Sequence, residues 1–171
     1  RLSRSGLLSC NSCHSLSTFG VDNLPVSTGH MWRQGPLNAP TVLNAALHRL
    51  QFWDGRARDV EEQAGMPILD ALEMAATEEH VLQVLQSIPE YVTWFGEAFP
   101  EEPQPLVYAN VGRAIGAFER ILLTPSAFDQ YLAGDAGALG ENALAGLETF
   151  MDVGCTACHN GAALGGQIFT F

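Results

Sequence analysis

Two short motifs constrain this chain more than any other feature of its sequence. The first is Cys10-Asn11-Ser12-Cys13-His14, the second is Cys155-Thr156-Ala157-Cys158-His159, and together they use all four cysteines. The C-x-x-C-H spacing is the attachment signal of c-type haem: both thiols bond to the macrocycle, and the adjacent histidine is the proximal ligand of the iron. The sequence therefore predicts two covalently bound haem c groups.

The composition is that of a folded chain with an acidic surface. Hydrophobic residues make up 47% and charged residues 16% of the 171 residues, which is typical of globular proteins. The net charge of -11 argues against nucleic acid as a partner. It suits docking to a basic patch on a protein partner, although simple solubility explains the charge equally well. No apolar run is long enough to predict a membrane span.

Hydrophobic periodicity predicts helices, and strand alternation is nearly absent. The Gly-, Pro-, Ser- and Asn-rich stretch 15–44 predicts a long irregular loop that wraps around a haem. Helix signals follow at 41–50, at 60–64 before Pro67, after a Thr77 cap until Pro89, at 105–123, after a Ser126 cap and after an Asn142 cap. In the helix after Thr77 the inward residues are expected to be Leu82, Leu85 and Ile88. In the helix at 105–123 the predicted stripe includes Val111, Ile115 and Phe118.

The breaker Thr124-Pro125 predicts a domain boundary. The predicted fold class is all-α, with two cytochrome c-like haem domains built from short helices and long loops. Residues 1–124 form the first haem domain, and residues 125–171 form the start of a truncated second one. The chain opens in a loop shortly before Cys10 and ends without a closing structure, so we expect a piece of a longer protein. Because haem is attached covalently outside the bacterial cytoplasm, we expect a periplasmic location.

A haem iron has six ligand positions, and the histidine of each motif fills only one. Three histidines lie outside the motifs, namely His30, His48 and His80. His30 lies in a Gly-rich loop that can reach back over the haem of His14, and ligand and non-ligand roles are equally open for it. His48 and His80 lie on predicted helices and are expected to be surface or packing residues.

Four further residues are candidates for chemistry. Glu73 lies in an apolar run, where a buried carboxylate is costly unless it is used or paired, although an exposed helix position is the simpler explanation. Cleavage of a peroxide at iron needs such an acid–base group. Gln63 has no distinguishing feature alone. Trp53 either lies between redox centres or simply packs, and Asn38 either caps a turn or binds a hard cation such as calcium.

Taken together, these residues resemble the bacterial diheme cytochrome c peroxidase family. The likeness covers the whole chain and is most specific over residues 1–76 and 155–166. It is carried by the first haem motif with the Leu-Ser-Arg-Ser-Gly string before it, and by Gly-His at 29–30, Gly-Pro-Leu-Asn-Ala-Pro-Thr-Val-Leu-Asn at 35–44, Phe-Trp-Asp-Gly-Arg-Ala at 52–57, Glu-Glu-Gln at 61–63 and Leu-Glu-Met at 72–74.

The resemblance implies an unequal pair of haems. His14 would be the proximal ligand of a low-potential haem at which peroxide is reduced, and His30 its removable sixth ligand. Glu73 would be the acid–base residue, with Gln63 as its polar partner. His159 would be the proximal ligand of a high-potential, electron-accepting haem.

The resemblance also implies roles between and around the haems. Trp53 would lie on the electron path between them, and Asn38 would be a ligand of one calcium ion. The sixth ligand of the second haem would lie beyond Phe171. The implied enzyme is a homodimer that reduces hydrogen peroxide to water with two electrons from a small donor, a cytochrome c or a cupredoxin.

Two alternatives stay open. One is a methylamine-utilisation-type diheme oxidase that acts on a protein substrate, which would lack a displaceable histidine at position 30. The other is a non-catalytic diheme electron carrier, which would leave Glu73 and Gln63 without a role.

Overall fold

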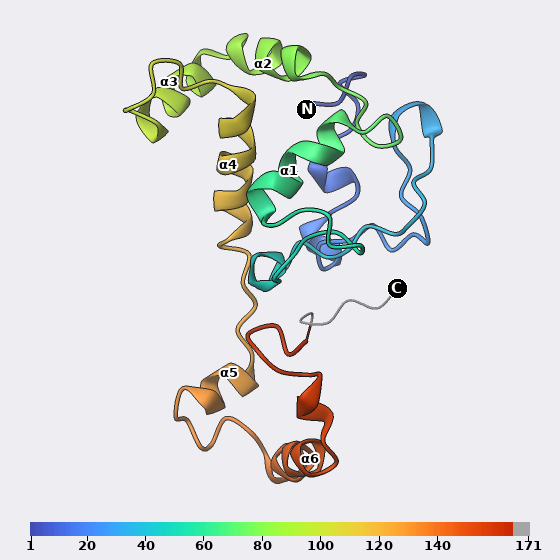
Figure 1. Ribbon diagram of the computed structural model, residues 1–171, viewed down its shortest axis with the longest axis vertical. Helices are drawn as coiled ribbons and strands as arrows, with labels where there is room; N and C mark the ends of the chain where they lie inside the picture. Colours follow the sequence, from blue (N-terminus) through green and yellow to red (C-terminus); the bar gives the residue numbers. More distant parts are fainter. Residues whose placement is uncertain (166–171) are drawn as a thin grey trace.

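The computed structural model describes residues 1–165, and over that range the chain is helical, as predicted. Its α-helices are α1 (Val60–Leu69), α2 (Glu78–Gln86), α3 (Pro89–Ala98), α4 (Tyr108–Glu119), α5 (Ala127–Leu132) and α6 (Glu141–Asp152) (Figure 1). Short 3₁₀ turns are η1 (Cys10–Ser12), η2 (Leu16–Thr18), η3 (His30–Trp32), η4 (Ala45–Leu47) and η5 (Cys155–Ala157). Between residues 1 and 165, β pairing is limited to two isolated bridges. None of the helices in this range is long and apolar enough to cross a membrane.

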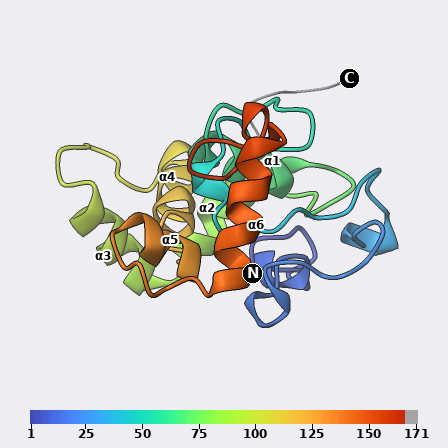
Figure 2. The same cartoon turned by 90° about the horizontal axis from the view of Figure 1, so that it is seen from below.

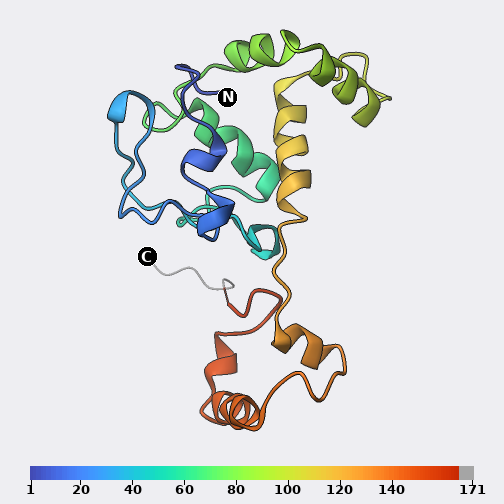
Figure 3. The ribbon, with the colours of Figure 1, turned by 180° about the vertical axis from the view of Figure 1, so that it is seen from behind.

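The described chain forms two lobes joined by an extended segment. The upper lobe holds α1 to α4 and the N-terminal loops, and the lower lobe holds α5, α6 and η5 (Figures 1 and 3). Seen from below, the loop of residues 15–40 lies on one side of α1 and α3 lies on the other (Figure 2). Thr124 and Pro125 lie in the connecting segment. The division into domains 1–124 and 125–171 stays a prediction, and residues 166–171 lie outside the described residues.

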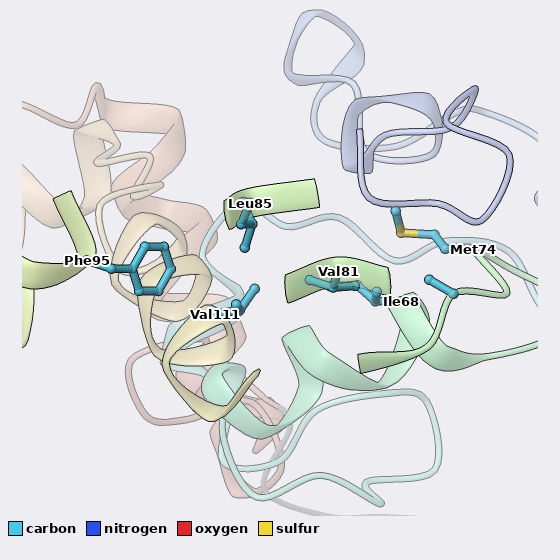
Figure 4. Close-up of a cluster of buried hydrophobic side chains, with 7 residues drawn as sticks. Ile68, Met74, Val81, Leu85, Phe95 and Val111 are labelled. Atoms are coloured by element: carbon cyan, nitrogen blue, oxygen red, sulfur yellow. The ribbon is translucent and has the colours of Figure 1, made fainter. Parts of the chain in front are cut away.

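The core of the upper lobe is built where α1, α2 and α4 meet. Its buried side chains are those of Ile68, Met74, Ala76, Val81, Leu85, Phe95 and Val111 (Figure 4). Burying an aliphatic side chain of this size contributes about 1.5–3 kcal/mol. The cluster therefore anchors the turn before Met74, which carries Glu73.

Two glycines let α4 pack closely against α1. A Cβ at Gly112 would lie 2.6 Å from the carbonyl oxygen of Glu61, and a Cβ at Gly116 would lie 2.7 Å from the Glu61 side chain. At position 112 the obstacle is main chain, so any larger residue there would push the helices apart, whereas at position 116 it would displace the Glu61 side chain. The approach also places Arg120, just after α4, against Glu61, and the guanidinium donates to both carboxylate oxygens at 2.8 Å.

Several predicted helix bounds were wrong, and local chemistry explains why. The helix predicted for 41–50 is only the turn η4, because Asn44 has a left-handed φ of 60°. The helix predicted to stop before Pro67 continues to Leu69. Pro67 cannot donate a main-chain hydrogen bond, which weakens the helix at that point. The helix nevertheless continues, because the next residue, Ile68, is buried in the core. Pro89 does not merely end a helix. It begins α3, which the periodicity did not predict, and proline suits the first position of a helix.

The remaining helix predictions were partly right. The Thr77 and Ser126 caps are confirmed, since each side chain accepts a hydrogen bond from the N–H three residues later. The cap of α6 is Gly140, so the prediction of an Asn142 cap was wrong. In α4, Val111 is buried as predicted but Phe118 is 51% exposed. The buried face of α4 instead includes Gly112, Gly116 and Glu119, which the hydrophobic stripe could not show.

Candidate functional site

The first haem motif folds into one tight turn. The N–H groups of Cys13 and His14 both donate to the carbonyl of Cys10, at 3.2 and 2.8 Å. The Nδ1 of His14 lies 3.2 Å from the carbonyl oxygen of Gly20. Because a carbonyl only accepts, this contact places the proton on Nδ1 and leaves the lone pair of Nε2 for a metal.

The second motif repeats this arrangement. Cys158 and His159 donate from their N–H groups to the carbonyl of Cys155 at 3.2 and 2.9 Å, and the Nδ1 of His159 lies 3.1 Å from the carbonyl oxygen of Leu164. None of the four cysteines is paired in a disulfide. Two thiols beside an imidazole with a free Nε2 are the donor set that a covalently attached haem needs, so the residues of both motifs fit haem.

The loop that carries His30 is pressed against the turn that carries Glu73. The N–H of His30 donates to the carbonyl of Glu73 at 2.6 Å. A Cβ added to Gly29 would lie 1.9 Å from the carbonyl oxygen of Leu72, so only glycine allows this approach. The contact therefore joins two segments that the sequence analysis had linked only through a family likeness.

The imidazole of His30 is held in an unusual way. Its Nδ1 atom is buried and has no hydrogen-bond partner among the described residues. The two residues after it, Met31 and Trp32, have left-handed φ values of 55° and 62° and expose their side chains by 73% and 87%. Non-glycine residues in this region of φ are strained. A strained, exposed loop with an unpaired imidazole is a segment suited to rearrangement.

Glu73 is half-buried, and its electrostatic surroundings favour its protonated form. Burial raises the pKa of Glu73, the carboxylate of Asp70 raises it further, and the guanidinium of Arg56 opposes both. Burial also raises the pKa of the Cys13 thiol; Ser27 acts in the opposite direction, and the carboxylates of Asp22 and Glu73 add to the rise. Glu73 is thus within electrostatic reach of the first haem motif.

Trp53 and Asn38, both singled out from the sequence, are in contact. The indole Nε1–H of Trp53 donates to the carbonyl of Asn38 at 3.1 Å, and the indole is 59% exposed. Asn38 borders a hollow of about 480 Å³ that Asp22 and Asn23 also line, so side-chain oxygens of the kind Ca²⁺ prefers are available there. Over residues 1–165, no cluster of three or more His, Cys, Asp or Glu side chains forms a metal site.

Comparison with known proteins places these residues in a family. The family model of the di-haem cytochrome c peroxidases matches residues 1–137. The chain belongs to the di-haem cytochrome c peroxidase family. Membership implies haem c as the cofactor.

Relatives and a solved structure agree with this assignment. The chain is 54% identical over 170 residues to cytochrome c551 peroxidase of Pseudomonas aeruginosa, covering 99% of this chain and 49% of that protein. It is 48% identical over 170 residues to cytochrome c551 peroxidase of Nitrosomonas europaea, with 99% and 50% covered. The crystal structure of a MauG-like protein associated with microbial copper homeostasis matches with a TM-score of 0.85 and 31% identity, covering 98% of this chain and 50% of that one. The chain therefore spans about half the length of the curated relatives it matches.

Not every predicted site residue is brought together. Gln63 lies on α1, and within residues 1–165 no hydrogen bond joins its side chain to Glu73. His48 ends η4 and is exposed, and His80 lies in the first turn of α2, so both fit the surface or packing role expected of them.

Sequence reasoning missed three polar residues that matter in the structure. Arg56 stacks its guanidinium 3.5 Å over the ring of Phe52, pairs with Asp54 and lowers the pKa of Glu73 by its charge. Glu119 is a buried acid at the end of α4. Asn44 holds the segment after α4. Arg56 and Asn44 carried a signal, because they lie within the Phe-Trp-Asp-Gly-Arg-Ala string and the string at 35–44, whereas Glu119 carried none.

Proposed function

We propose that the chain is part of a periplasmic diheme cytochrome c peroxidase that reduces hydrogen peroxide to water. The two electrons come from a small donor protein, a cytochrome c or a cupredoxin, and two protons are consumed for each peroxide. The observation that carries this proposal is the direct contact between the His30 loop and the Glu73 turn beside the first haem motif. It gives one site both a candidate metal ligand and a candidate proton carrier.

In this proposal, two sets of residues hold the haems. Cys10, Cys13 and His14 would hold the peroxidatic, low-potential haem of domain 1–124. Cys155, Cys158 and His159 would hold the high-potential haem of domain 125–171, whose sixth ligand would lie beyond Phe171. When bound, the haem supplies an iron centre at which electrons reach the peroxide.

His30 would act as a gate. In the resting protein its imidazole would occupy the sixth ligand position over the haem of His14. Its release needs a movement of the surrounding loop, and the left-handed residues Met31 and Trp32 mark where the backbone is already strained. Reduction of the other haem would drive this rearrangement of the His30 loop. Peroxide would then enter only after that haem holds an electron.

Glu73 would move the proton that the reaction needs. It would take the proton from one peroxide oxygen and return it to the other as the bond between them breaks. Its raised pKa supports this role, because the carboxylate is then a stronger base than usual and its protonated form persists closer to neutral pH, where it can donate the proton again. Gln63 would hold the departing oxygen as a polar partner.

The remaining proposed roles concern the surroundings of the haems. Trp53 would lie on the electron path between them, and its hydrogen bond to Asn38 supports a fixed indole orientation. The side chain of Asn38 would be one ligand of a calcium ion. The working assembly would be a homodimer.

Two rival functions are less well supported. A methylamine-utilisation-type oxidase acting on a protein would not need a displaceable histidine, and this chain has His30 in contact with the acid turn. The two relatives at 54% and 48% identity are named peroxidases, whereas the MauG-like structure is 31% identical. A plain electron carrier would give no reason for a half-buried carboxyl at Glu73.

The test is hydrogen peroxide turnover by the haem-loaded protein with a reduced c-type cytochrome as donor. Activity is expected after one-electron reduction, and Glu73→Gln should lower kcat by about 10²- to 10⁴-fold, the usual contribution of a positioned acid–base group. The matched control is Glu97→Gln on the exposed face of α3, which should retain parental activity. No turnover in any redox state would refute the peroxidase function, and unchanged turnover in Glu73→Gln would refute the assigned acid.

A further inference from the structure

The start of the extended segment between the two lobes is fastened to the upper lobe through Asn44. The Nδ2–H₂ of Asn44 donates to the Oγ1 of Thr124 at 2.6 Å, and the N–H of Thr124 donates to the Oδ1 of Asn44 at 2.9 Å. The N–H of Asn44 also donates to the carbonyl of Leu122 at 2.8 Å. These bonds join positions 80 residues apart in the sequence. We refer to the pair as the Asn44–Thr124 clasp.

Two separate requirements, one of the backbone and one of the side chain, favour asparagine at position 44. The backbone of Asn44 has φ 60° and ψ 7°, the left-handed region that asparagine adopts more readily than most residues other than glycine. Its side chain uses an amide N–H₂ as donor and an amide oxygen as acceptor at the same time. Few other side chains supply both groups at this length.

Hydrogen bonds of the next residue, Ala45, connect the clasp to the turn that carries Trp53. The carbonyl of Ala45, which is buried, accepts from the Nε2 of Gln51 at 2.9 Å. Gln51 exchanges main-chain hydrogen bonds with Ala57 in both directions, at 2.8 and 3.5 Å, and so closes the turn that carries Trp53. Gln51 and Ala57 are themselves buried, which shields these bonds from competing water. In Figures 1 and 3, η4 lies beside the start of the extended segment, at the lower end of α4.

We propose that the Asn44–Thr124 clasp sets the position of the lobe carrying His159 relative to the Trp53 turn, and so the rate of electron transfer between the two haems. The transferred species would be one electron, exchanged between the haem on His159 and the haem on His14: one haem would be oxidised as the other is reduced, and no atom or proton would be transferred. Such transfer slows steeply with distance, so a loosened segment lowers the average rate. Asn44 and Thr124 are positioning residues, and this role rests on the proposed function only in requiring two haems that exchange electrons.

Three variants separate positioning from simple stabilisation. Thr124→Val keeps the shape but removes the Oγ1 acceptor, and Thr124→Ser restores a hydroxyl. Asn44→Gly removes both side-chain bonds while keeping the left-handed backbone accessible. It serves as a second disruption that leaves position 124 unchanged.

The measurement is the rate at which one photochemically supplied electron equilibrates between the two haems of the haem-loaded protein, without peroxide; an electron that first reaches the haem on His14 should move to the high-potential haem on His159. Redox titration gives the potential of each haem in the same samples. Thr124→Val should slow the transfer by roughly fivefold, the factor by which the loss of one net hydrogen bond of about 1 kcal/mol shifts the equilibrium of the clasp, and Asn44→Gly, which removes two bonds, should slow it at least as much, both at unchanged potentials. Thr124→Ser should transfer at the parental rate.

A Thr124→Val protein with a lower Tm but a parental transfer rate overturns the proposal, because the clasp then only stabilises the fold. Equal slowing in Thr124→Ser and Thr124→Val also overturns it, because the hydroxyl is then irrelevant. Slowed transfer in a protein that consumes no peroxide supports the clasp and refutes the peroxidase function instead, so the two failures are distinguishable.

Discussion

The N–H of His30 donates to the carbonyl of Glu73 at 2.6 Å, which couples the position of a candidate iron ligand to that of a candidate acid. The bond is between main-chain atoms, so any shift of the His30 loop must break it or move the Glu73 turn as well. Opening of the ligand position and adjustment of the acid are therefore mechanically linked. Gly29, immediately before His30, is the residue that makes this contact possible.

Gly29→Ala is expected to disrupt this contact. The added Cβ would lie 1.9 Å from the carbonyl oxygen of Leu72 and 2.6 Å from that of Glu73, and neither is the flexible end of a side chain. Overpacking of this kind destabilises by about 1–3 kcal/mol or more. The measurement is the free energy of unfolding in urea, together with the haem absorption spectrum.

Gly96→Ala in α3 is the matched control for Gly29→Ala. A Cβ there meets nothing within 4 Å, and the residue lies inside a helix. It should leave stability unchanged or raise it by about 0.5–1 kcal/mol. If both variants unfold at the same urea concentration, the His30 loop does not press on the Glu73 turn as described.

Glu119 should make stability depend on pH between about 4.5 and 7. Burial and the nearby carboxylate of Glu61 raise the pKa of Glu119 to about 7, from an ordinary value of 4.5. The guanidinium of Arg120 is already paired with Glu61. Between these pH values the folded chain keeps a proton that the unfolded chain has released. Stability therefore falls as pH rises through this window, by up to about 3 kcal/mol from this one group.

The check is urea denaturation of the parent and of Glu119→Gln at several pH values from 4.5 to 7. In Glu119→Gln, the free energy of unfolding should fall less steeply with rising pH than in the parent. Glu148→Gln, on the exposed surface of α6, should keep the parental slope. Identical slopes in all three proteins would show that Glu119 titrates as an ordinary surface acid.

The structure also shows which parts of the site can be predicted from the sequence. The C-x-x-C-H turns and the Thr77 and Ser126 caps could be predicted, because each depends on residues within a few positions of one another. Contacts across the chain were not readable. Nothing near Asn44 in the sequence indicates Thr124, and the electrostatic effect of Arg56 on Glu73 depends on how two separate turns pack.

Proline and glycine account for most of the errors in the predicted fold. Pro67 and Pro89 were both read as helix ends, although one lies within α1 and the other begins α3. Whether a proline breaks or starts a helix depends on which carbonyls need a partner, and that is settled by tertiary packing. Likewise, the glycines of α4 pack against Glu61 and move the buried face of that helix away from its apolar stripe.

Replacing the two cysteines of one motif should remove the covalent haem of that motif and leave the other haem in place. The double variant Cys155→Ser/Cys158→Ser should retain haem on Cys10 and Cys13, and the mass of the denatured protein should fall by one haem. The double variant Cys10→Ser/Cys13→Ser should show the converse. Intact mass spectrometry measures both. An unchanged mass in either variant would show that the corresponding motif is not an attachment site.

The most direct test of the His30–Glu73 site is the initial rate of peroxide consumption by the fully oxidised, haem-loaded protein, before any electron has been supplied. If His30 blocks the sixth ligand position, the oxidised parent should consume no peroxide, and oxidised His30→Gly should consume peroxide without a lag. His48→Gly, which changes an exposed histidine outside the site, should consume no peroxide in the oxidised state, like the parent. A His30→Gly protein that still requires prior reduction, or a parent that reacts equally fast when oxidised, would contradict the gating role of His30.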